Sequence, residues 1–194
     1  MLKRNPHYWN KDVNGVAEPY PEEKVLQIVG DENTDYLLFR QGKLETYQLR
    51  PEDVNEAVAD QRDFTVFNAE GSLGSSLWSF NQNPVNEEKP FYSWFTKKEF
   101  RQAMSCLLNR ERIIVQTYRG LAEPMYYFFS RANPYYNPDI TLRWRYDIDE
   151  AKKILKKCGM EEKGGVLYDS KGVLVEFDLA IPSTSTIAND IAQI

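Results

Sequence analysis

The sequence contains one histidine, His7, and two cysteines, Cys106 and Cys158, among 194 residues. A serine, cysteine or threonine nucleophile needs a base beside it, and a zinc or iron site needs several ligands at short spacing. His7 has no second histidine and no cysteine pair near it in the sequence. The two cysteines fall on apolar helix faces, which predicts small core residues rather than a disulfide. We therefore predict no catalytic residues, no metal ligands and no cofactor.

Long apolar runs and a basic excess are also missing. No stretch approaches the roughly 18 apolar residues that a membrane-spanning helix needs, and no signal-peptide pattern opens the chain. The net charge is −5, and acidic and basic residues are interspersed. This charge pattern argues against nucleic acid and against a membrane surface as binding partners.

The first part of the chain alternates short apolar segments with helix signals. Asp31 can cap a helix that Gly42 ends, and Pro51 begins a second helix that runs to about residue 60. Short connections between strand and helix patterns indicate an α/β fold with a parallel sheet. The predicted strands are residues 23–29, 44–49 and 64–69.

The second part follows the polar, proline-containing residues 81–90 and begins with helix signals. Thr96 and Glu99 form a capping-box pattern, and Asn109 and Asp147 are placed to cap two further helices. A hairpin is predicted around residues 169–172, with its second arm continuing as a strand. A final apolar helical stripe carries no stop signal, so we expect the chain to be part of a larger protein.

Five segments in this order and spacing resemble the peptide-type, family 5 extracellular solute-binding proteins of ABC importers. The chain departs from the usual family pattern at Lys43 and Glu45, and at residues 128–131, "FFSR", where the family has a proline-rich turn. The five segments are "RNPHYW" (4–9), "DENTDYLLFRQGKLETYQL" (31–49), "KPFYSWFTKKEFRQAMSCLLNRERII" (89–114), "YRGLAEP" (118–124) and "YDIDEAKKILKKCG" (146–159).

The resemblance implies a partial two-lobed, periplasmic-binding-protein-like fold of type II, in the peptide-binding cluster. Residues 1–77 would be part of the first lobe, with a βαβαβ unit, and residues 78–194 the first half of the second. The implied protein is a monomer that captures oligopeptides or other small solutes and delivers them to ABC permease subunits in the membrane. It would be periplasmic or anchored at the cell surface, as a lipoprotein or a secreted protein.

Candidate ligand-binding residues lie where the second and third predicted strands end, because ligands bind beyond the carboxyl ends of parallel strands. In residues 70–81, glycines allow a close backbone approach, serines offer hydrogen bonds and a tryptophan offers a stacking face. The resemblance places the first crossing between lobes here. The alternative is a flexible linker with a buried tryptophan. The candidates are Tyr47, Gln48, Ser72, Gly74, Ser75, Leu77, Trp78 and Asn81.

The sequence is also compatible with other functions. The chain could be the ligand-sensing domain of a transcription regulator with a similar fold, or an oligosaccharide-binding member of the same family. An enzyme acting on carbohydrates is disfavoured, because adjacent acids such as Glu161 and Glu162 do not face one scissile bond. The aromatic loop of residues 123–139 could stack on a ligand, but packing of the loop onto its own lobe is favoured.

Overall fold

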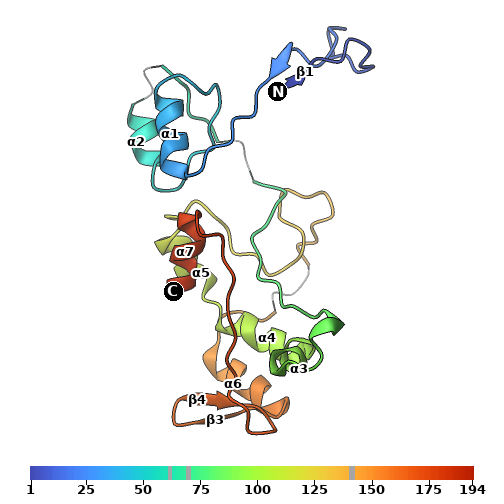
Figure 1. Ribbon diagram of the computed structural model, residues 1–194, viewed down its shortest axis with the longest axis vertical. Helices are drawn as coiled ribbons and strands as arrows, with labels where there is room; N and C mark the ends of the chain where they lie inside the picture. Colours follow the sequence, from blue (N-terminus) through green and yellow to red (C-terminus); the bar gives the residue numbers. More distant parts are fainter. Residues whose placement is uncertain (61–62, 69–70, 140–142) are drawn as a thin grey trace. The chain divides into compact units, whose positions relative to one another are not determined.

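The computed structural model packs as two compact units, Met1–Gln48 (unit 1) and Leu49–Ile194 (unit 2). Figure 1 follows the chain through both units from blue to red. No helix in the described part of the chain has both the length and the apolar character needed to cross a membrane. The described residues are 1–60, 63–68, 71–139 and 143–194.

Unit 1 is held by one short ladder and one helix. β1 and β2 pair antiparallel, with Leu2 opposite Lys24. The Asp31 carboxylate accepts a hydrogen bond from Thr34 N at 2.8 Å, which caps α1. Gly42 follows the helix with φ +70°, a conformation that favours glycine, so both predicted ends of this helix are confirmed. The elements are β1 (Leu2–Lys3), β2 (Glu23–Lys24) and α1 (Glu32–Arg40).

The predicted parallel sheet is wrong for the described residues. Only Glu23–Lys24 of the first predicted strand forms a strand, and it pairs antiparallel with β1. Residues 44–49 and 64–68 are neither helix nor strand, and Ala69 lies outside the described residues. A strand forms only where a neighbouring strand supplies hydrogen bonds, and an apolar pattern does not identify that neighbour. The βαβαβ unit predicted for residues 1–77 is therefore not formed here.

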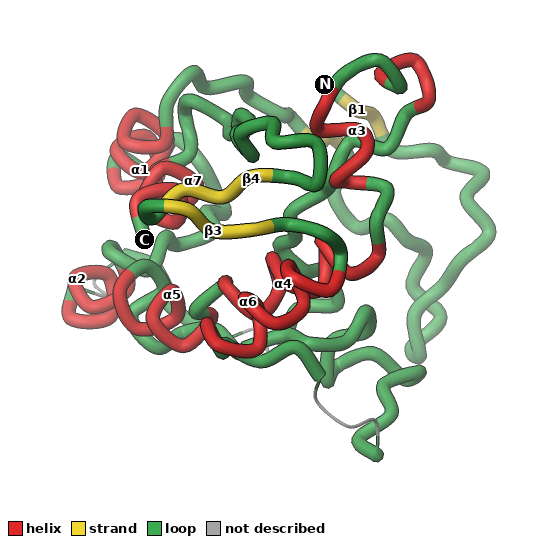
Figure 2. The backbone as a smooth tube through the Cα atoms, turned by 90° about the horizontal axis from the view of Figure 1, so that it is seen from below, coloured by secondary structure: helices red, strands yellow, loops and turns green. Residues whose placement is uncertain are grey.

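Among the described residues of unit 2, the regular structure is mainly helical, with one antiparallel hairpin of two short strands. In Figure 2 the two arms of that hairpin, β3 and β4, run side by side. The predicted hairpin around residues 169–172 is present only as a bridge between Tyr168 and Leu174 beyond β4, and its second arm does not continue as the predicted strand. The elements are α2 (Val54–Ala59), the 3-10 turn η1 (Pro84–Asn86), α3 (Pro90–Phe95), α4 (Lys98–Leu107), α5 (Arg110–Gln116), α6 (Ile148–Lys157), β3 (Glu161–Lys163), β4 (Val166–Tyr168) and α7 (Thr186–Gln193).

The core of unit 2 lies where α4 packs against α6, with α3 beside them. Asp147 caps α6 by accepting from Glu150 N at 2.9 Å, and its own N–H donates to Cys106 O at the end of α4. The predicted α6 cap is confirmed, and both cysteines are free, as predicted. The buried residues of this core are Trp94, Phe95, Phe100, Ala103, Cys106, Ala151, Ile154, Leu155 and Met160.

Asp169 ties the turn after β4 to α3. Its carboxylate accepts from Trp94 Nε1 at 3.0 Å, from Lys171 N at 2.8 Å and from Val173 N at 2.9 Å. Burial raises the pKa of Asp169, but the three hydrogen bonds together outweigh it and leave the pKa below the ordinary 3.8. The charged form of Asp169 is thus favoured by folding.

We expect the stabilisation by Asp169 to disappear in acid. A lowered folded pKa gives stability that is present above the unfolded pKa and is lost as the pH falls through the folded value, below 3.8. Asp169→Asn should lower the free energy of unfolding by about 1 kcal/mol at pH 7. This difference from the wild type should shrink as the pH falls from about 5 to about 2, in urea unfolding at each pH.

Asp178→Asn is the matched control, because Asp178 is an exposed aspartate nine residues after Asp169. Its unfolding curve should follow the wild type at every pH. A loss in Asp169→Asn that is equally large at pH 2 and pH 7 would contradict the assignment of the stabilisation to the carboxylate.

Candidate ligand-binding site

Residues 71–81 run along unit 2 without helix or strand and are anchored near their end. The Phe80 ring meets Phe95 edge-on at 5.1 Å between centroids and Phe100 at 6.0 Å, so this end is fixed to the core. The preceding residues are exposed, including Leu77 at 65% and Trp78 at 46%. The alternative interpretation of Trp78 as a buried core ring is therefore contradicted.

The polar candidates of this segment shape the local backbone. Ser72 Oγ accepts from Gly74 N at 3.0 Å, and Asn81 Oδ1 accepts from Asn83 N at 3.1 Å. Both side chains are exposed and keep a donor, a hydroxyl or an NH2, outside these bonds. Gly74 and Ser75 are exposed as well. The segment thus presents small polar groups beside an exposed indole.

The two remaining candidates belong to unit 1. The Tyr47 ring stacks on Phe39 at 5.6 Å and lies 5.3 Å from the Tyr36 ring, so it packs against α1. Gln48 is exposed at the end of the unit. The candidates from Ser72 to Asn81 all lie on one continuous stretch of unit 2. The grouping of all eight residues around one ligand stays a prediction.

The aromatic loop, residues 123–139, packs against the junction of α4 and α5 through Tyr126. Tyr126 donates its hydroxyl to Glu111 Oε1 at 2.9 Å, and the Arg110 guanidinium lies 4.7 Å from the centre of its ring. Arg110 also donates to Ser105 O at 3.1 Å. Burial first, and then the bond to Glu111, raises the pKa of Tyr126, so its hydroxyl stays protonated as a donor. This packing agrees with the favoured interpretation of the loop.

The loop also lies beside the glycine- and serine-rich segment, which the sequence did not indicate. A Cβ added at Gly71 would come within 3.4 Å of Ala132 Cβ, so glycine allows the two stretches to run close together. Phe128 and Tyr135 of the loop are 76% and 74% exposed. Two segments far apart in sequence thus place aromatic and small polar groups on one part of unit 2.

These groups suit non-covalent binding. Burial raises the pKa of both the Cys106 and the Cys158 thiol, which keeps them protonated and poor nucleophiles. His7 lies exposed in unit 1, where its backbone N–H donates to Asn5 Oδ1. Among the described residues, no three His, Cys, Asp or Glu side chains are grouped closely enough to hold a metal ion. Hydroxyls, amides and ring faces can orient a ligand through hydrogen bonds and stacking.

Comparison with known proteins decides the family. Residues 1–194 match the model of bacterial extracellular solute-binding proteins, family 5, middle part. The chain belongs to this family. A family 5 resemblance was predicted from five sequence segments, and that prediction is confirmed.

Two bacterial relatives are much longer than this chain. A probable ABC transporter-binding protein of Deinococcus radiodurans is 31% identical over 192 aligned residues, which are 92% of this chain and 32% of that protein. The oligopeptide-binding protein AppA of Bacillus subtilis is 27% identical over 163 residues, 77% of this chain and 30% of AppA. The chain thus spans about a third of the length of the curated relatives it matches.

The fold also matches that of a solved structure. The structure of AppA from Bacillus subtilis in complex with a nonapeptide matches with a TM-score of 0.55 and 22% identity, over 76% of this chain and 28% of AppA. The predicted class, a partial periplasmic-binding-protein-like α/β fold, is confirmed. These relatives are named as binding proteins, and the family is one of binding proteins rather than enzymes.

Proposed function

We propose that the chain is part of an extracytoplasmic solute-binding protein that captures oligopeptides or similar solutes between two lobes. Its residues 1–77 would belong to the first lobe and residues 78–194 to the second. The loaded protein, a monomer, would deliver its solute to the permease subunits of an ABC importer. It would work in the periplasm or at the cell surface, as a secreted protein or a lipoprotein.

The match of the family 5 model to all 194 residues carries this proposal. The name of AppA supports a peptide as the solute, and the name of the Deinococcus protein supports a link to an ABC transporter. The site chemistry agrees with both. A peptide offers backbone donors and acceptors for Ser72, Ser75 and Asn81, and apolar side chains for an exposed ring.

Trp78 is the side chain on which we expect peptide binding to depend most. Its ring is 46% exposed and follows the small polar residues. It can therefore cover an apolar ligand group with no loss of core packing. In the full-length protein, Trp78→Ala should weaken binding of a nonapeptide pool by about 1–3 kcal/mol, a factor of roughly 5 to 150. Calorimetric titration measures this loss.

Trp9→Ala is the control for this experiment, because Trp9 is also exposed, at 81%, and lies outside the proposed site. Neither variant should lower the free energy of unfolding by more than about 1 kcal/mol. Unchanged affinity in Trp78→Ala, or a large loss of stability with unchanged affinity per folded molecule, would remove Trp78 from the site. No binding of the pool by the wild type would contradict the proposed function itself.

A further inference from the structure

Five rings of the aromatic loop contact one another and form a cluster on unit 2, here named the ring platform. Between ring centres, Phe129 lies 5.2 Å from Phe128 and 5.9 Å from Tyr135. Tyr127 lies 5.7 Å from Phe129 and 6.3 Å from Tyr136. Tilted and edge-on ring pairs at such distances attract each other, so the five rings hold one another in place.

The ring platform combines a fixed base with exposed outer rings. Tyr126, the residue before the platform, donates to Glu111 and packs against the Arg110 guanidinium, which joins the loop to α5. Phe128 and Tyr135 are 76% and 74% exposed, whereas the other three rings are partly buried. Large apolar groups that gather at a surface mark interaction sites more often than isolated exposed residues do.

The charges of the loop favour an uncharged ligand group at the rings. Its charged residues are Glu123, Arg131 and Asp139, the last at the end of the loop. Arg131 Nε lies 3.3 Å from Glu123 Oε2, so these two charges compensate each other. A charged ligand group would lose hydration against the rings and gain little from this ion pair. An apolar or aromatic group would instead remove apolar surface from water on both sides of the contact.

The ring platform adjoins the polar segment of the proposed peptide site. A Cβ added at Gly71 would come within 3.4 Å of Ala132 Cβ, and Ala132 lies between the platform residues in sequence. Ser72 and Ser75 follow Gly71 and are exposed. A peptide advances about 3.3 Å per extended residue, so one that bonds to these serines reaches the rings within a few residues. Its backbone and one of its side chains can therefore be bound at the same time.

We propose that the ring platform is a side-chain subsite that selects peptides carrying an aromatic residue, an inference that rests on the proposed peptide-binding function. The ligand ring stacks on the two exposed rings while the peptide backbone bonds to the serine-rich segment. Because the platform rings already hold one another in place, binding costs little side-chain entropy. The platform should favour an aromatic over a charged side chain about 5- to 30-fold. Its five residues are Tyr127, Phe128, Phe129, Tyr135 and Tyr136.

The test uses the full-length protein and nonapeptides of alanine and serine in which one residue, at each position in turn, is phenylalanine or glutamate. Calorimetric titration gives the Kd of each peptide. At the position that meets the rings, the phenylalanine peptide should bind about 5- to 30-fold more tightly than the glutamate peptide. The double variant Phe128→Ala with Tyr135→Ala should reduce this preference to about 2-fold or less. A general loss of fold weakens both peptides equally, so the ratio of the two Kd values reports the ring contact itself.

Phe67→Ala is the matched control, because Phe67 is 79% exposed on another segment, and its ratio should equal that of the wild type. Equal affinities of the phenylalanine and glutamate peptides for the wild type, at every position, would overturn the subsite and leave the proposed function intact. A preference that falls as far in Phe67→Ala as in the double variant would also overturn it.

Two further outcomes distinguish the subsite from the proposed function. If the wild type binds none of the nonapeptides, the proposed function fails and the subsite fails with it. Titration with maltohexaose, a neutral sugar, tests the other ligand class that stacks on rings. Sugar binding that the double variant abolishes, without any preference among the peptides, would assign the rings to a sugar and overturn the inference.

Discussion

Replacing Phe100 with alanine should lower the free energy of unfolding of unit 2 by about 3–5 kcal/mol, the range for removing a fully buried aromatic side chain. Phe100 is 0% exposed in the middle of α4. Its ring lies 5.9 Å from Phe95 of α3, 6.0 Å from Phe80 and 6.2 Å from Phe177. Truncation would open a cavity lined by the rings of Phe80, Phe95 and Phe177, the last of which is far from Phe100 in sequence. Urea unfolding followed by circular dichroism measures the loss.

Phe128→Ala is the matched control for this substitution. Phe128 is 76% exposed, and its ring contacts the ring of its sequence neighbour Phe129. The same truncation there should cost about 1 kcal/mol or less. Equal losses in the two variants would show that the helical core around Phe100 does not hold unit 2 together.

Helix ends could be predicted from the sequence where the signal lies within a few residues. Asp31 and Asp147 accept from the backbone three residues later, and Gly42 and Gly159 have φ of +70° and +83° after their helices. Such caps depend on the side chain and its own turn, so they need no tertiary information. Asn109 follows the same rule and accepts from Arg112 N at 2.9 Å.

The predicted capping box at Thr96 is wrong, for an instructive reason. No helix was predicted for the residues just before Thr96, where the structure has α3, a six-residue helix with Pro90 at its start. Because α3 runs up to Phe95, the Thr96 hydroxyl donates to Tyr92 O at 2.8 Å, within that helix. Lys97 becomes the residue before α4, without a side-chain cap. A short aromatic helix is stabilised mainly by packing, which periodicity does not reveal.

The predicted sheet failed for a related reason, since pairing is a tertiary property. Ile28 and Val25 belong to a convincing apolar segment, yet they are 99% and 69% exposed. The candidate site stays a prediction. Residue types and the family resemblance pointed to the exposed segment around Trp78, whereas packing against α1 accounts for Tyr47. The closeness of the aromatic loop to Gly71 could come only from the three-dimensional structure.

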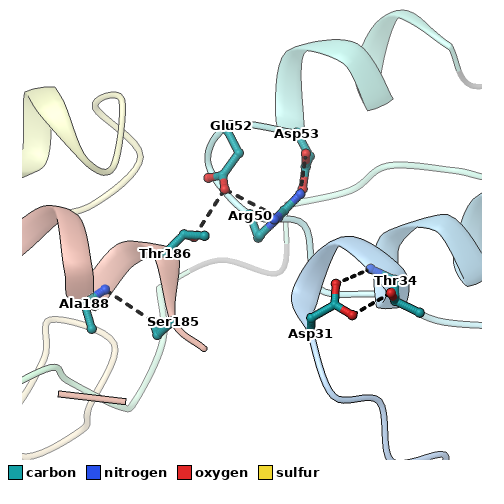
Figure 3. Close-up of polar contacts among 8 residues, drawn as sticks. All are labelled: Asp31, Thr34, Arg50, Glu52, Asp53, Ser185, Thr186 and Ala188. Atoms are coloured by element: carbon teal, nitrogen blue, oxygen red, sulfur yellow. Dashed lines mark hydrogen bonds and ion pairs between the residues drawn. The ribbon is translucent and has the colours of Figure 1, made fainter. Parts of the chain in front are cut away.

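Asp53→Ala tests a buried ion pair, as Phe100→Ala tests a buried apolar side chain. It would deprive the Arg50 guanidinium, 12% exposed, of the carboxylate that accepts two of its hydrogen bonds (Figure 3). Losing one partner of a buried ion pair costs about 3–5 kcal/mol, because the remaining charge is poorly solvated. Glu52 at 3.5 Å can compensate in part. We therefore expect a loss of about 3 kcal/mol in urea unfolding.

A double variant that combines Arg50→Met and Asp53→Leu replaces both partners of the ion pair, and its stability is compared with that of Asp53→Ala. Apolar residues of similar size often replace a buried ion pair with little loss of stability. We expect the double variant to be at least about 1 kcal/mol more stable than Asp53→Ala, although it removes more polar atoms. If instead the double variant is as unstable as Asp53→Ala or less stable, the attraction within the pair, rather than the cost of burying a guanidinium that has lost this carboxylate, determines the stability at the start of α2.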